Sequence, residues 1–234
     1  MAALRLTEAE SAPASLAMPS ATSHGRVVTV IGAHGGAGAT TAALAIARDA
    51  ERGVCLVDAD LAGGDTASRL ELQGHPADAG LAAQVDATVA WGALARRAAF
   101  GTVVVACPRP DLAWLVRDGA VRGLLAAARR SAALVVVDAG RPLGPSCEAV
   151  ADADLVVIVA HAHRSEVAEC ARRRVERLGV EGARIVACPT APTMFERIAG
   201  RLRGSGPAMD LDDPEELLLL VEGRLAGLPP RWAG

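Results

Sequence analysis

Six short apolar runs, most of them rich in valine, alternate along the chain with longer stretches of helical character. The runs are 26–32, 54–58, 102–107, 133–138, 154–160 and 184–188. Such continuously apolar runs are typical of strands covered on both faces, and their alternation with helices predicts a parallel sheet with right-handed crossovers. The expected helices are 40–52, 86–98, 118–130, 145–152, 165–178 and 194–203. The predicted fold class is α/β, a Rossmann-like three-layer α/β/α sandwich with a mostly parallel sheet.

The two ends of the chain differ from this middle part. Residues 1–25 are rich in Ala, Ser, Pro and Thr without periodicity, which predicts a disordered tail before a single domain over 26–234. The sequence D-P-E-E at 213–216 predicts the start of a last helix near 213–226. The unbroken apolar run 217–221 predicts that this helix is buried against the sheet or a partner. A helix lying on a membrane surface would carry more basic residues.

Composition narrows the function classes. Apolar residues make up 51% of the 234 residues, enough for a sizeable core, but aromatic residues only 2%. So few aromatics argue against a reader of single-stranded nucleic acid, and a net charge of −3 gives no general field for polyanions, so no sequence-specific nucleic-acid partner is expected. No apolar run is long enough for an integral membrane segment, and the start lacks a signal pattern. Five scattered cysteines predict buried free thiols, and the expected location is the cytoplasm.

The chain contains no lysine, so all 24 basic residues are arginines. This absence excludes Schiff-base chemistry, a lysine nucleophile and the lysine of an ordinary phosphate-binding loop. Part of the bias has a simple origin in a GC-rich genome, since asparagine is absent as well. Codon bias alone does not explain how a phosphate-binding loop tolerates the loss.

Such a loop is nevertheless predicted at residues 32–41, which read G-A-H-G-G-A-G-A-T-T between the first strand and the first helix. Glycines let the backbone approach a ligand closely, and successive N–H groups with the helix N-terminus form an anion nest. A P-loop NTPase fold follows from this setting. The candidate residues for ATP binding are His34, Gly35, Gly36, Ala37, Gly38, Ala39, Thr40 and Thr41.

The loop departs from the pattern G-x-x-x-x-G-K-[ST] at two positions. Ala33 replaces the first glycine and Ala39 replaces the lysine that reaches the β- and γ-phosphates. Losing such a charge-assisted contact costs about 1.5–3 kcal/mol, which is about one to two decades of affinity. Backbone N–H groups and Mg²⁺ still permit weak or vestigial ATP binding, whereas efficient hydrolysis is not expected.

Acidic residues follow two of the strands. Asp58 and Asp60 lie in V-D-A-D-L-A-G-G-D at 57–65, where Asp60 is the candidate catalytic residue because it could orient an attacking water. Asp138 ends the strand A-L-V-V-V-D in the manner of a Walker B acid, so Thr40 and Asp138 are the candidate ligands of Mg²⁺ or its water. Taken alone, acids at strand ends also serve merely to cap loops or to interact with solvent.

Two further features lie near the same edge of the predicted sheet. Arg141 follows Asp138 closely and is a candidate phosphate contact. His161 and His163 follow the fifth strand and share a face, so a metal site is conceivable there. No further ligands are apparent in the sequence, and a loop pair without a metal is the preferred interpretation.

Residues 32–41, 57–65 and 133–142 resemble the deviant Walker A class of ATPases, which includes MinD and ParA. In that class the loop reads K-G-G-x-G-K-[ST]-[ST], and its first lysine reaches across a dimer; His34 and Ala39 stand at the two lysine positions here. The closest resemblance is to the CpaE-like and septum-site-determining (Ssd-like) branch of high-GC Gram-positive bacteria. That branch also lacks the loop lysine and has the motif D-x-D-L-x-x-G-D, matched by Asp58, Asp60, Gly64 and Asp65.

This resemblance covers about 26–190 and implies a role in septum-site determination or in secretion and pilus assembly. Implied partners are a second copy in a face-to-face homodimer, a secretion or pilus ATPase, or cell-division proteins. We therefore expect a localisation or assembly factor with a degenerate ATP site. Two alternatives remain: an active ATPase in which arginines or a partner replace the lysines, and an interaction module whose loop is purely structural.

Overall fold

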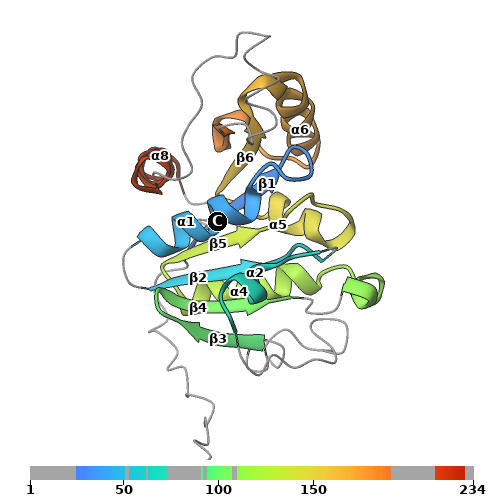
Figure 1. Cartoon of the computed structure of the whole chain (residues 1–234), viewed down its shortest axis with the longest axis vertical. Coiled ribbons are helices and arrows are strands. Elements are labelled where there is room, and N and C mark those ends of the chain that lie inside the picture. Colours follow the sequence, from blue (N-terminus) through green and yellow to red (C-terminus); the bar gives the residue numbers. More distant parts are fainter. Residues whose placement is uncertain are drawn as a thin grey trace, which may run out of the picture.

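The computed structural model describes residues 25–50, 53–61, 63–72, 91, 94–106, 110–190 and 214–229. The described residues form one seven-stranded sheet in the order β3-β4-β2-β5-β1-β6-β7 (Figure 1). Neighbouring strands are parallel except β3, which is antiparallel to β4. The strands are β1 (Arg26–Gly32), β2 (Val54–Asp58), β3 (Ala95–Ala98), β4 (Gly101–Val105), β5 (Leu134–Asp138), β6 (Leu155–His161) and β7 (Ile185–Thr190).

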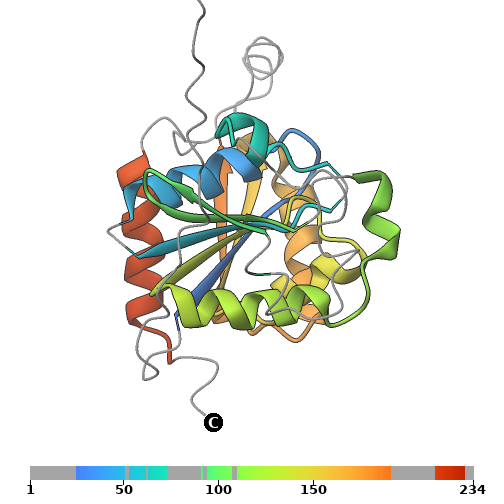
Figure 2. The same ribbon diagram turned by 90° about the horizontal axis from the view of Figure 1, so that it is seen from below.

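Helices cover both faces of this sheet (Figure 2). The helices are α1 (Ala39–Asp49), α2 (Thr66–Arg69), α4 (Ala120–Ser131), α5 (Cys147–Ala151), α6 (Ser165–Arg177) and α8 (Pro214–Ala226). One apolar cluster joins α1 and α8 to the sheet, and a second joins α4, α5 and α6 to its other face. Val28 and Val30 of β1 belong to the first cluster, Val27 and Ile31 to the second, because successive strand residues point to opposite faces. The predicted three-layer α/β/α sandwich is confirmed.

The structure also corrects one predicted helix. All six predicted strands are present within two residues at each end, but residues 95–98, predicted as the end of helix 86–98, form the edge strand β3. Ala95 and Arg96 favour helices intrinsically, yet a two-residue turn at Ala99 and Phe100 folds this segment back onto β4, and pairing with the sheet outweighs propensity. The predicted helix 194–203 and, apart from Gly25, the predicted tail 1–25 lie outside the described residues.

The last helix packs beside the helix that follows the glycine-rich loop (Figure 1). Leu217 and Val221 of α8 are buried in the apolar cluster of α1, as the apolar run predicts, whereas Leu219 faces outward and is largely exposed. One side of α8 is therefore buried against the domain itself. No described helix combines the length and the apolar character needed to cross a membrane.

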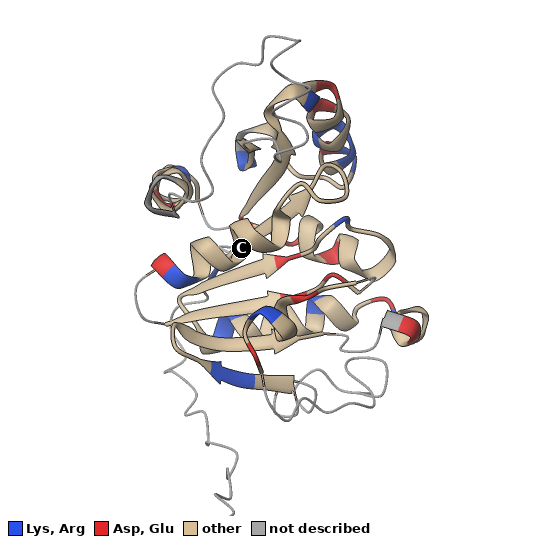
Figure 3. Ribbon diagram, in the orientation of Figure 1, with Lys and Arg blue, Asp and Glu red and all other residues tan. Residues whose placement is uncertain are grey.

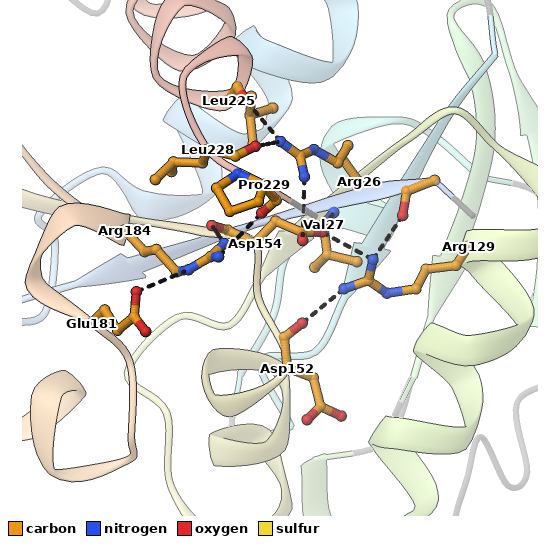
Figure 4. Close-up of polar contacts among 11 residues, drawn as sticks. Arg26, Val27, Arg129, Asp152, Asp154, Glu181, Arg184, Leu225, Leu228 and Pro229 are labelled. Carbon is orange, nitrogen blue, oxygen red and sulfur yellow. Dashed lines mark hydrogen bonds and ion pairs between the residues drawn. The ribbon is translucent and has the colours of Figure 1, made fainter. Parts of the chain in front are cut away.

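A buried ionic network lies at the end of the sheet where the parallel strands begin (Figure 4). The Asp154 carboxylate accepts hydrogen bonds from the Val27 amide at 2.8 Å and the Arg129 guanidinium at 2.9 Å, and Arg26 lies 3.8 Å away. Burial lowers the pKa of Arg129, while Asp154 acts against that change. Arg26 also donates to the Leu225 carbonyl at 2.6 Å, at the end of α8. The network thus joins the first strand to the last helix.

The described cysteines Cys55, Cys147, Cys170 and Cys188 are free thiols. Cys55 and Cys188 are buried as predicted, and burial raises the pKa of Cys55. Cys170 is exposed, so the prediction of buried thiols is wrong there. The reason is its position on α6, where most side chains are charged and face solvent. Cys107 lies outside the described residues.

Candidate functional site

The glycine-rich loop connects the carboxyl end of β1 to the first turn of α1, as predicted. Its base is tied to both neighbouring strands, since the Gly32 amide donates to the Gly140 carbonyl at 2.7 Å and the Ala33 amide to the Val159 carbonyl at 2.9 Å. Gly36 and Gly38 have φ of 71° and 98°, a left-handed conformation that favours glycine. Gly38 is the N-cap of α1 and provides no side-chain cap, so the helix N-terminus faces the loop with free amides.

The acids predicted from the sequence meet at the carboxyl ends of β2 and β5 (Figure 3). Asp58 and Asp138 are direct neighbours in the register of these parallel strands. Burial raises the pKa of Asp58 to about 7, and the nearby Asp138 adds to this effect. Burial also raises the pKa of Asp138, while the Thr40 hydroxyl and the Gly140 amide, 3.0 Å from Asp138 Oδ1, act to lower it. The fold therefore brings Thr40 and Asp138 together.

Two glycines make room for these carboxylates. A side chain on Gly64 would collide with the carboxylate of Asp58, and one on Gly140 with that of Asp60. The Asp60 amide donates to Asp58 Oδ1 at 3.1 Å, which ties the loop after β2 to the carboxylate at the end of that strand. Gly64 of the D-x-D-L-x-x-G-D motif therefore has a steric role: it admits a buried acid.

The residue set suits a magnesium ion in one specific respect. Oδ2 of Asp138 is buried and has no hydrogen-bond partner within the described part of the chain, and the same is true of Oδ2 of Asp58. An unsatisfied buried carboxylate oxygen is costly unless a cation or a proton compensates it. Carboxylate and hydroxyl oxygens are ligands that Mg²⁺ accepts. Asp138 and Thr40 are thus the residues that would hold the ion or its water.

The loop, Asp60 and Asp65 line one pocket of about 480 Å³, within the usual range for small-molecule sites, whereas the more deeply buried Asp58 and Asp138 are not among its lining residues. Its lining residues are Gly32, His34 to Thr41, Asp60, Gly63, Asp65, Arg69, Gly140, Arg141 and Leu143. Every predicted ATP-binding residue therefore faces the pocket, as do Asp60 and Arg141. Ala39, at the lysine position, is largely buried in the pocket wall.

Sequence reasoning missed Arg69 as a pocket residue. Arg69 ends the short helix α2, and its Nε donates to Asp65 Oδ2 at 2.7 Å. One of its terminal nitrogens lies 3.3 Å from the Thr41 hydroxyl, in the first turn of α1. The available signal was the spacing of Asp65 and Arg69, four residues apart, which is typical of a helical ion pair.

His34, at the position of the dimer-spanning lysine in the resemblance, is held inside its own chain. The His161 amide donates to His34 Nε2 at 3.3 Å, so a neutral His34 carries its proton on Nδ1, which donates to the Gly35 carbonyl at 2.9 Å. The His34 ring meets His161 edge-on, with centroids 4.5 Å apart, and His161 stacks on His163 at 5.7 Å. Within the described residues, no group of three or more His, Cys, Asp or Glu side chains is placed to hold a metal ion.

The pKa of Asp58 predicts how stability depends on pH. Between about pH 4 and 7 the unfolded chain loses the Asp58 proton while the folded protein keeps it, so this contribution to stability falls as pH rises and is constant above the folded pKa. Asp58→Asn removes the ionisation and keeps the shape. The measurement is urea unfolding in metal-free buffer. The free energy of unfolding of the variant minus that of wild type should be about 2–3 kcal/mol larger at pH 8 than at pH 5. If the free energy of unfolding changed equally with pH in both proteins, the raised pKa assigned to Asp58 would be wrong.

Comparisons with known proteins identify solved structures that share this fold. No protein-family model and no curated protein matches the sequence. A plasmid partition protein from Borrelia burgdorferi bound to AMPPNP superposes with a TM-score of 0.63 at 13% identity, covering 86% of this chain and 99% of that one. The cell division ATPase MinD from Pyrococcus furiosus gives 0.58 at 16% identity, covering 89% and 91%.

A third solved structure is cobyrinic acid a,c-diamide synthase from Mycobacterium smegmatis, with a bound ATP analogue and magnesium. Its TM-score is 0.58 at 20% identity, and the match covers 85% of this chain and 96% of that one. Identities this low carry information on the fold alone. The chain has the fold of the P-loop ATPases of the MinD and ParA type.

Proposed function

We propose that this chain is a MinD/ParA-like P-loop protein with a degenerate ATP site. One observation carries the proposal: the phosphate loop keeps its glycines, its uncapped helix N-terminus and Thr40 beside Asp138, while a methyl group replaces the lysine. Loop amides would bind phosphate, and Asp60 would orient a water. Bound Mg²⁺ would neutralise phosphate charge at Thr40 and Asp138.

We assign the chain to the CpaE-like and Ssd-like branch of this class, acting in the cytoplasm as a localisation or assembly factor for septation or for secretion and pilus assembly. The motif around Asp58, Asp60, Gly64 and Asp65 supports this assignment. Partners would be a second copy of the chain and a secretion ATPase or cell-division protein. Exposed Trp114 and Leu143, which follow the carboxyl ends of β4 and β5, suit a protein contact at this edge of the sheet.

Two measurements on the purified protein test the proposal against its alternatives. Calorimetry with Mg-ATP shows whether nucleotide binds, and phosphate release shows whether it is hydrolysed. Weak binding without turnover supports the degenerate site. Binding with turnover favours an active ATPase, the candidate that the guanidinium groups of Arg69 and Arg141 in the pocket support. Absence of binding favours an interaction module with a purely structural loop.

Loss of either metal-binding residue should affect ATP affinity only when magnesium is present. Thr40→Ala and Asp138→Asn each remove a ligand of the ion or its water, so Mg-ATP affinity should fall about tenfold, while metal-free ATP affinity changes little. Thr40→Ser keeps the hydroxyl and should behave as wild type. The measurement is calorimetry with magnesium and with EDTA. Equal losses under both conditions would show that these residues do not act through the metal.

A further inference from the structure

One of the two arginines that line the pocket lies beside the first turn of the helix that follows the glycine-rich loop. Arg69 comes from α2, far from the loop in sequence, yet its terminal nitrogen reaches the Thr41 hydroxyl at 3.3 Å. Thr41 belongs to the first turn of α1, whose amides face the same pocket. Arg69 therefore lies beside the group of donors that would bind phosphate.

Electrostatics around this position favour an anion. The first turn of α1 contains no acidic residue and its N-cap, Gly38, offers no side chain, so no side chain of the helix itself compensates the positive end of its dipole there. Arg69 adds a full positive charge at the same end. Asp65 is the carboxylate paired with Arg69, and it lies on the α2 side of the pocket, as its N-cap. A phosphate group would neutralise the helix end and the guanidinium together.

The ion pair between Arg69 and Asp65 can be broken, and replaced by a contact between Arg69 and phosphate, at little cost in stability. Both side chains are about half exposed, at 45% and 48%, and they lie four residues apart on one short helix. Exposed pairs of this kind contribute little to stability. A guanidinium binds phosphate through two parallel hydrogen bonds, a stronger interaction than one exposed contact to a carboxylate.

We propose that Arg69 replaces the missing loop lysine as the cation that binds the phosphates of the nucleotide, releasing Asp65 as it does so. This inference rests on the proposed binding of nucleotide in this pocket. Asp65 then acts as a competitor: it holds Arg69 beside the loop before binding and must give it up when phosphate enters. Removing the two partners of the ion pair therefore has opposite effects on phosphate affinity.

The test is calorimetry with Mg-ATP and with magnesium tripolyphosphate, which lacks the nucleoside. Arg69→Gln should weaken both ligands about 10–100-fold, the range expected for loss of a charge-assisted contact. Arg69→Lys should recover part of this loss. Asp65→Asn should bind both ligands several-fold more tightly than wild type, because Arg69 is then released from its competitor.

Arg173→Gln is the matched control, since Arg173 forms an exposed pair with Glu169 at the same spacing, on α6 and outside the pocket lining. It should bind as wild type. Thermal unfolding checks that each variant folds, and if Arg69→Gln does not fold, the increase for Asp65→Asn still decides the matter.

The outcomes separate this inference from the proposed function. If wild type binds neither ligand, the proposed nucleotide site is wrong and the role of Arg69 is wrong with it. If wild type binds and Arg69→Gln binds equally well, only the role of Arg69 is overturned. Equal losses for Arg69→Gln and Asp65→Asn would mean that the ion pair is merely structural, which also overturns the inference.

Discussion

Purified protein is expected to release phosphate from Mg-ATP no faster than its Asp60→Ala variant. Ala39 supplies no cation to the transferred phosphoryl group, and His34 is turned back toward Gly35 and His161 of its own chain. Cations delivered to the transition state are worth about 10³–10⁵ in rate where arginine fingers supply them. Asp60 still faces the pocket, but a positioned water without charge neutralisation leaves the main electrostatic requirement unmet.

The role proposed for Arg69 is compatible with this expectation. A guanidinium that binds the ground state and the transition state equally raises affinity without accelerating the reaction. The assay is steady-state phosphate release, with Asp60→Ala as background and Arg141→Ala as a second variant. Robust turnover that Asp60→Ala abolishes would reject the degenerate site and support the active-ATPase alternative. Its loss in Arg141→Ala as well would identify the replacing cation.

Ala39→Lys should raise affinity for Mg-ATP by about one to two decades, the value of one charge-assisted contact. Ala39 is the first residue of α1 and one of the residues that line the pocket. Ala39→Met is the matched control, because it has similar bulk and no charge, and it should not gain affinity. Calorimetry with Mg-ATP provides the measurement.

The result also depends on Arg69. If Arg69 already binds the phosphates, then adding Arg69→Gln to the Ala39→Lys protein should cost less than it costs in wild type, because two cations acting on one ligand are not additive. A folded Ala39→Lys protein that binds no better than Ala39→Met would show that the loop does not hold phosphate in the expected place.

The alternation of apolar runs and helical stretches was sufficient for six of the seven strands of the sheet, and the glycine-rich motif was sufficient for the position of the pocket at their carboxyl ends. Strands such as β1 and β5 are mostly apolar because they are covered on both faces. Parallel strands bring their carboxyl ends to one edge of the sheet, so Asp58, Asp138 and the loop had to meet. Gly36 and Gly38 adopt the left-handed backbone that the loop pattern indicates.

What the sequence could not show depends on contacts between distant segments. Residues 95–98 carry no strand pattern, and only pairing with β4 makes them a strand. Arg69 reaches the pocket because α2 folds over the start of α1, a contact across 28 residues. The orientation of His34 likewise depends on the His161 amide, 127 residues later in the chain. Local periodicity carries no information on such pairs.

The ionic network at the beginning of the strands also has a consequence for biosynthesis. Arg26, in the first strand, donates to the Leu225 carbonyl, 199 residues later, and Arg184 donates to the carbonyl of Pro229 at 3.1 Å. These bonds cannot form until the C-terminal segment has been translated, and contacts of such long range slow folding. A nascent chain that ends before α8 leaves the outer side of α1 uncovered, an apolar surface next to the phosphate loop. The apolar side of the helix that follows the glycine-rich loop is therefore covered only after synthesis of the last helix.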